Sequence, residues 1–178
     1  MTTINDIPDH IKPLLGKQIT AASMDKYPFK QEDETALFGE KAMIYFSDGL
    51  SLQISTEDST HFTEGGELAL ALNQSKPVAG STFKENEISV VKIFEWEKTD
   101  ENLNDEKKCF AQIEFHSSHE LILSCGFFYF DHESDKMECL VTGDLSISCT
   151  NELSALDFEQ NSSAKSSHLF KSTYRLPS

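Results

Sequence analysis

Arginine is almost absent from this sequence, since Arg175 is the only one in 178 residues. Thirty acidic residues face fifteen basic ones, which leaves a formal net charge of −15. Arginine makes the bidentate contacts that suit phosphates and base edges, and a strongly acidic protein repels the nucleic-acid backbone. We therefore expect no direct binding to nucleic acid, whereas the same electric field would attract a basic protein.

Long apolar runs are also missing. The longest, residues 121–130, is interrupted by Ser124 and Gly126, and a membrane-spanning helix needs roughly 18 apolar residues. The first residues show neither the basic nor the apolar region of a signal peptide. We therefore expect a cytoplasmic protein that does not contact a membrane.

Cysteine pairs with metal-ligand spacing do not occur. The four cysteines stand singly and far apart, and no Cys-x-x-Cys is present: Cys109, Cys125, Cys139 and Cys149. On strand-like segments of a cytoplasmic protein, such cysteines are typical of free, buried thiols.

Catalytic and cofactor-binding motifs are lacking as well. The pair Gly65-Gly66 has no downstream Lys-Ser/Thr, so it is not a phosphate loop, and no Gly-x-Ser-x-Gly occurs. The best metal candidates are His116, His119, Asp131 and His132, with Cys125 or Cys139 nearby. Polar residues in turns explain this group more simply. We therefore expect no enzyme, no metal and no cofactor; a metal-dependent enzyme using the His116/His119/His132 region is the third hypothesis.

Alternating hydrophobicity is the strongest signal that the sequence does contain. Ala42, Ile44 and Phe46 alternate with other residues before Asp48-Gly49, and a second alternating run ends at Ile54. An Asp-Gly pair between two alternating runs predicts a β-hairpin, in which both turn residues take positive φ. We expect one face of this hairpin to be buried.

Further strands are predicted over residues 17–24, 88–96, 110–115, 120–130, 137–141 and 144–148, joined by short turns that favour an antiparallel meander. Residues 67–72 fit a strand or a short helix. A start signal at Asp6 or Ile7-Pro8 and a stop signal at Gly16 predict a short helix over residues 8–15, and helical spacing predicts another over residues 151–160. The expected fold class is α+β, a single domain over residues 1–160 built on a mostly antiparallel sheet, with a strongly curved or half-barrel sheet as one form of it. The Ser-rich basic tail, residues 161–178, is ordered only if it packs on the body.

Acidic residues concentrate in two segments that read as loops. Residues 31–64 hold eight acids and one base, and residues 95–106 hold six acids and one base. They form either solvated surface or a recognition patch for a basic partner. The candidate partner-binding residues are Glu57, Asp58, Glu64, Asp100, Glu101, Asp105 and Glu106.

The segment Met43-Ile44-Tyr45-Phe46-Ser47-Asp48-Gly49-Leu50-Ser51-Leu52, together with the acidic single-domain character, resembles bacterial polymorphic-toxin immunity proteins, including those of contact-dependent growth inhibition. The resemblance implies a protein-binding inhibitor that neutralises a cognate toxin, many of which are basic nucleases. It transfers no individual residue role. The alternative hypothesis is a small-ligand-binding, barrel-like protein in which residues 127–130 line an apolar pocket.

Overall fold

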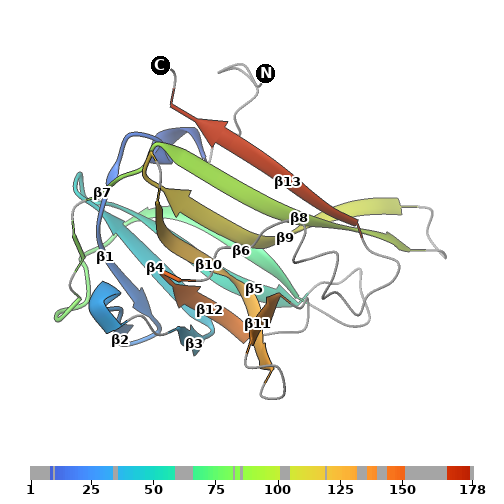
Figure 1. Cartoon of the computed structure of the whole chain (residues 1–178), viewed down its shortest axis with the longest axis horizontal. Helices are drawn as coiled ribbons and strands as arrows, with labels where there is room; N and C mark the ends of the chain where they lie inside the picture. Colours follow the sequence, from blue (N-terminus) through green and yellow to red (C-terminus); the bar gives the residue numbers. More distant parts are fainter. Residues whose placement is uncertain are drawn as a thin grey trace.

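β-Strands make up almost all of the regular structure that the computed structural model shows (Figure 1). The model describes residues 9, 11–33, 36–58, 66–81, 83–84, 86–100, 105–118, 120–131, 136–139, 144–150 and 168–176. In chain order the described elements are η2 (Lys12–Leu14), β1 (Gln18–Met24), β2 (Tyr27–Pro28), η3 (Gln31–Asp33), β3 (Leu37–Gly39), β4 (Lys41–Phe46), β5 (Leu50–Asp58), β6 (Gly66–Gln74), β7 (Asn86–Glu87), β8 (Val90–Asp100), β9 (Asp105–His116), β10 (Leu121–Asp131), β11 (Lys136–Cys139), β12 (Asp144–Ser148) and β13 (His168–Arg175).

The strands form two sheets. In the first sheet the order is β2-β1-β4-β5-β6, with β7 also paired to β1. In the second sheet it is β13-β8-β9-β10-β12-β3, with β11 paired to β10. All of these pairings are antiparallel, which confirms the predicted antiparallel architecture. Over the described residues no strand of one sheet is hydrogen-bonded to the other, so the sheets do not close into a barrel.

The hydrophobic core lies between the two sheets. The first sheet contributes Ile44 and Leu52, the second contributes Ile113 and Phe115, and all four are almost completely buried. Side chains on one face of each strand recur at every second residue, so alternating apolar positions bring this core together. Figure 1 shows the second sheet lying in front of the first.

The predicted hairpin is confirmed. β4 pairs with β5 so that Ala42 is opposite Ile54 and Ile44 is opposite Leu52, and these four side chains are fully buried. The turn differs from the expected type. The Gly49 amide donates to Phe46 O at 3.1 Å, and Gly49 has a φ of +85° while Asp48 does not have a positive φ. This is a three-residue loop, in which only the glycine needs the left-handed conformation.

Asp48 stabilises this turn from outside. Its carboxylate accepts a hydrogen bond from Lys17 Nζ and another from the Leu50 amide at 3.1 Å. The lysine hydrogen bond is the main reason why the pKa of Asp48 is below its ordinary value. The turn thereby ties the β4–β5 hairpin to the segment that precedes β1.

The chain crosses from the second sheet to the first after Gly39, because β3 belongs to the second sheet and β4 to the first. A Cβ atom built on Gly39 would lie 2.7 Å from Met24 Cγ, so a larger residue there would require the Met24 side chain to move. The Asp25 carboxylate accepts the Glu40 and Lys41 amides there, at 3.3 and 2.9 Å. The absent side chain therefore allows β1 and β3 to approach where the two sheets meet.

The helical part of the prediction is wrong where the structure describes it. Instead of a helix over residues 8–15 there is one 3-10 turn, Lys12–Leu14, with Pro13 inside it. Proline lacks the amide hydrogen that a longer helix needs, and Gly16 follows with a φ of +81°. The helix expected over residues 151–160 lies outside the described residues. None of the described helices has the length and apolar character needed to cross a bilayer.

Strands also replace several predicted loops. Short strands β2 and β3 lie within residues 25–40, and β5 and β8 run further than expected, to Asp58 and Asp100. Residues 67–72, which fitted a strand or a helix, belong to strand β6. β13 lies within the predicted basic tail and pairs with β8 over its whole length, from His168 opposite Glu97 to Arg175 opposite Val90.

Candidate functional site

Two hairpin ends carry most of the candidate partner-binding residues. Glu57 and Asp58 end β5, Asp100 ends β8, and Asp105 and Glu106 begin β9. We call the last two residue pairs of each hairpin the acidic hairpin ends. These pairs are Glu57–Glu67 and Asp58–Gly66 in β5–β6, and Thr99–Glu106 and Asp100–Asp105 in β8–β9. The prediction that these residues lie in loops is wrong, because the strand ladders continue through them. Glu64 and Glu101 lie outside the described residues.

The strand register places acidic residues opposite one another. Glu57 is the partner of Glu67 in the β5–β6 pair, and Asp100 is the partner of Asp105 in the β8–β9 pair. Directly opposite residues in an antiparallel pair have Cβ atoms about 5 Å apart, where like charges repel. The register therefore brings acidic residues that are near one another in the sequence to directly opposite positions at two hairpin ends.

The charge changes sign one step further along the second hairpin. Thr99 is opposite Glu106, and then Lys98 is opposite Lys107. The acidic part of the β8–β9 hairpin is thus confined to its final two pairs. Figure 1 shows this hairpin extending beyond the neighbouring strands, and both acidic hairpin ends lie toward the same side of the view. β6 packs against β9, so the two hairpins are also neighbours in the fold.

The second sheet has a separate group of polar residues on the face turned away from the core. Gln112, Glu114 and His116 alternate along β9 with the core residues Ile113 and Phe115. All three polar residues are nevertheless buried, with exposed fractions of 0%, 0% and 6%. Over residues 112–116, both faces of this strand are therefore shielded from solvent.

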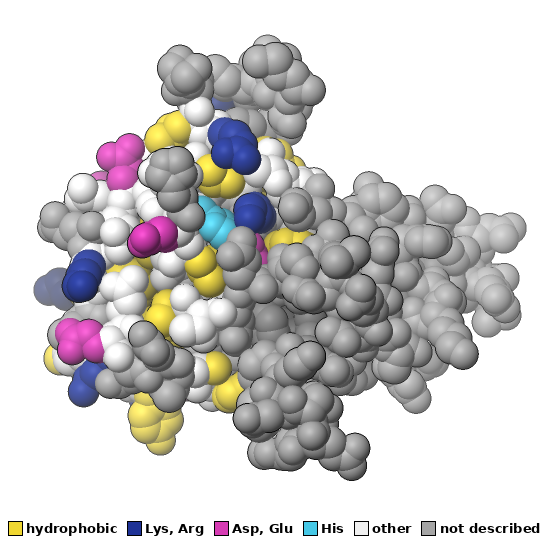
Figure 2. Space-filling model, viewed as in Figure 1, with side chains coloured by type: hydrophobic (Ala, Val, Ile, Leu, Met, Phe, Trp, Pro, Cys, Tyr) yellow, Lys and Arg dark blue, Asp and Glu magenta, His cyan; other side chains and the backbone are white. Residues whose placement is uncertain are grey.

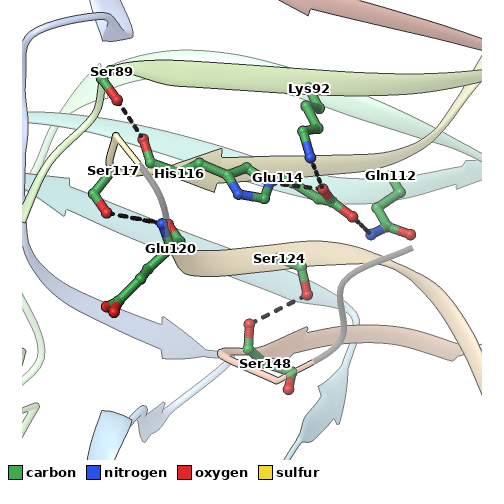
Figure 3. Close-up of polar contacts among 9 residues, drawn as sticks. All are labelled: Ser89, Lys92, Gln112, Glu114, His116, Ser117, Glu120, Ser124 and Ser148. Atoms are coloured by element: carbon green, nitrogen blue, oxygen red, sulfur yellow. Dashed lines mark hydrogen bonds and ion pairs between the residues drawn. The ribbon is translucent and has the colours of Figure 1, made fainter. Parts of the chain in front are cut away.

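Glu114 is the centre of this group, which Figure 3 shows. Its Oε1 accepts a hydrogen bond from Gln112 Nε2 at 2.8 Å, and its Oε2 lies 2.8 Å from His116 Nε2. Lys92 Nζ lies 4.0 Å from the same Oε2, and the side chain of Lys92 is 20% exposed. A buried carboxylate needs such partners, because burying it alone costs several kcal/mol. We call Lys92, Gln112, Glu114 and His116 the Glu114 cluster.

The register explains why these side chains meet. Lys92, Glu114, Ser124 and Ser148 are successive partners across β8, β9, β10 and β12, so they form one row on the same face. Figure 2 shows basic side chains at the surface of the face seen in that view. The sequence interpretation placed His116 in a solvated turn, which is wrong: it is the buried last residue of β9.

A histidine held by a buried carboxylate can take part in proton transfer when a nucleophile or substrate contacts its ring. Two of the neighbouring hydroxyl groups, those of Ser124 and Ser148, have other partners. Ser124 Oγ donates to Ser148 O at 3.2 Å, and Ser148 Oγ lies 3.0 Å from Thr150 Oγ1. Gln112 Oε1 and Ser146 Oγ are buried without a hydrogen-bond partner. The described geometry therefore shows a charged, hydrogen-bonded cluster and no activated serine.

The suggested metal ligands do not come together in the described part of the chain. His116 is engaged with Glu114, whereas Cys125 faces the opposite side of the second sheet, in the core. Cys125 has no disulfide partner, and burial raises the pKa of its thiol. His119 and His132 lie outside the described residues, as do the side chains of Asp131, Cys139 and residues 127–130. Within the described residues, no three His, Cys, Asp or Glu side chains are grouped closely enough to hold a metal ion.

Comparison with known proteins gives no family for this chain. No family model matches it, and no curated protein or solved structure is significantly similar to it.

The sequence interpretation missed Lys92, Gln112 and Glu114 as a connected group. A signal was present, since Gln112, Glu114 and His116 occupy every second position and therefore one face of a strand. Polar residues at this spacing normally indicate a solvated face. Their burial became visible only in the folded structure.

Proposed function

We propose that this protein is a protein-binding inhibitor, an immunity protein that neutralises a basic toxin domain by direct contact through its acidic hairpin ends. The observation that carries the proposal is the register of the two hairpins, in which Glu57 is opposite Glu67 and Asp100 is opposite Asp105. The net charge of −15 supplies the long-range attraction for such a partner.

The energetic argument starts from the repulsion between facing acids. Like charges directly opposite one another destabilise a strand pair by roughly 0.2–1 kcal/mol. A partner that brings lysine or arginine side chains to these ends removes that repulsion as it binds. The repulsion between the facing acids therefore destabilises only the free protein, and its removal adds to the free energy of binding.

The test begins with the product of the gene immediately upstream, whose C-terminal domain is the expected toxin. Co-expression with our protein should restore growth, and the two purified proteins should form a complex. Reversing Asp100 and Asp105 to lysine should slow association and flatten its dependence on salt, because attraction between separated charges is screened within about 8 Å at physiological ionic strength. Stopped-flow fluorescence at several salt concentrations measures both quantities.

The matched control reverses two exposed acids away from the acidic hairpin ends, Glu32 and Glu87. It changes the net charge by the same amount, so an effect of net charge alone would slow both variants equally. Slower association in the Asp100/Asp105 variant alone supports the proposed surface. Equal rates in all three proteins would contradict that surface, and a failure of the upstream product to bind the unaltered protein would contradict the proposed function.

A further inference from the structure

β6 is the end strand of the first sheet and has an unusually regular ladder. It pairs with β5 over nine successive residues, from Gly66 opposite Asp58 to Gln74 opposite Leu50, without a register shift. Among the described strands, none pairs with its other side. Peptide groups along that side are therefore directed away from the sheet, where another extended strand can bond to them.

The other sheet edges carry features that oppose pairing with a second chain. β2 is two residues long and contains Pro28, and β3 is three residues long. β13 is longer, but Lys171 and Arg175 belong to it. Short length, proline and charged residues are the usual means by which edge strands avoid association. β6 has none of these after Glu67, since residues 68–74 contain neither a charge nor a proline.

Apolar side chains of β6 remain partly accessible. Leu70 and Leu72 pack against the hydrophobic core, yet both are only half-buried. Their partners on β5, Ile54 and Leu52, are completely buried. The difference arises because β6 has a neighbouring strand on one side only. A second strand beside it would cover the remaining surface of both leucines.

The sequence of β6 is nearly a palindrome about Leu70. We propose that two copies of this protein pair through their β6 strands, antiparallel and with Leu70 opposite the partner's Leu70. In this register Leu68 faces the partner's Leu72, and Ala69 faces the partner's Ala71. A two-fold axis makes every such contact occur twice, which is the arrangement of most homodimers. The first sheets of the two copies would join into one continuous sheet.

Charge also favours this register. Glu67, the only charged residue of β6, would lie opposite the partner's Asn73 and not opposite another acid. The two Glu67 positions are six residues apart along the joined strands, or about 20 Å at ~3.3 Å per residue. That separation exceeds the screening length of about 8 Å in physiological salt. The acidic hairpin ends therefore stay far apart, and the proposal does not depend on what they bind.

Sedimentation of the full chain tests the proposal directly. The unaltered protein should have twice the 20.0 kDa mass of one chain. Changing Ala69 and Ala71 together to glutamate would place acid against acid in both symmetric contacts, and dimerisation should weaken about tenfold or more. Changing both to lysine should have the same effect. Mixing the two variants should restore the dimer, since each glutamate then faces a lysine.

These positions suit such changes because their partners on β5, Ser55 and Gln53, are uncharged and neither alanine belongs to the buried core. A circular dichroism spectrum of each variant checks that it folds. Amide hydrogen exchange of the unaltered protein supplies a measurement without mutation: exchange in residues 66–74 should slow as protein concentration rises. A single-chain mass for the unaltered protein would overturn the proposal. Full dimerisation of each like-charged variant would overturn it as well, because the dimer would then use another surface.

Discussion

Along residues 112–116 of the second sheet, the side chains on both faces are buried, but the two faces depend on different kinds of contact. The face toward the first sheet carries Ile113 and Phe115, which contact other apolar side chains. The opposite face carries Gln112 and Glu114, which depend on hydrogen bonds and ion pairs. Shape decides the stability of the first face, whereas the second face is stable only while each polar group has a partner. Alternation along a strand can therefore place apolar side chains on one buried face and hydrogen-bonded polar side chains on the other, instead of separating a buried face from a solvated one.

The largest effect should come from the apolar face. Replacing Phe115 by alanine removes a fully buried ring from the core and should lower the free energy of unfolding by about 4 kcal/mol. Urea denaturation followed by circular dichroism measures this change. Phe115→Leu is the control, because it retains most of the volume and should cost about 1 kcal/mol. Equal losses in the two variants would mean that the ring volume is not what this face requires.

The polar face should be nearly as sensitive at its centre. Glu114→Ala removes the carboxylate that Gln112 and His116 contact, and it should cost about 3 kcal/mol in urea denaturation. Glu114→Gln keeps an oxygen acceptor of the same shape and should cost about 1 kcal/mol. A negligible loss in both variants would show that this face behaves like solvated surface, and the contrast between the faces would disappear.

Alkaline pH should act on the apolar face through Cys125. Burial raises the pKa of this thiol above its ordinary value of 9.0, so the folded state favours the uncharged form. The resulting stabilisation is complete below pH 9.0 and is lost as the pH rises above it, by about 1.4 kcal/mol per pH unit. The contribution of the Cys125 thiol is isolated by comparing the unfolding free energies of the unaltered protein and of Cys125→Ala across this pH range. A constant difference between the two proteins would contradict it.

The smallest effects should distinguish two serines on the polar face. Ser124 Oγ donates to Ser148 O, so Ser124→Ala should cost about 1 kcal/mol. Ser146 Oγ is buried without a hydrogen-bond partner, so Ser146→Ala should leave the stability unchanged or raise it by up to about 1 kcal/mol. Thermal denaturation of the two variants side by side is sufficient. A loss for Ser146→Ala equal to that for Ser124→Ala would show that its hydroxyl has a partner in solution.

Local patterns predicted the elements whose signal is contained within a few residues. The β4–β5 hairpin follows from alternation and the Asp48-Gly49 turn, and the antiparallel meander follows from short connections between strands. The helix predicted over residues 8–15 is wrong, because its start and stop signals fit a single 3-10 turn at Lys12–Leu14 equally well and Pro13 prevents a longer helix. The charged segments 55–58 and 97–100 were assigned to loops on composition, yet each continues a ladder already formed by its partner strand.

Residue counts alone determined the strong negative charge and the near absence of arginine, whereas alternation within strands and the short connections between them predicted the antiparallel β character. Tertiary structure decided which distant residues meet. Pairing of strands set Lys92 of β8 beside Glu114 of β9, and the burial of this face left the Glu114 carboxylate in contact with Lys92, Gln112 and His116. Pairing also left β6 at the end of its sheet. The physical reason is that strand order and the burial of a second sheet face arise from contacts between segments far apart in the chain, which no local pattern encodes.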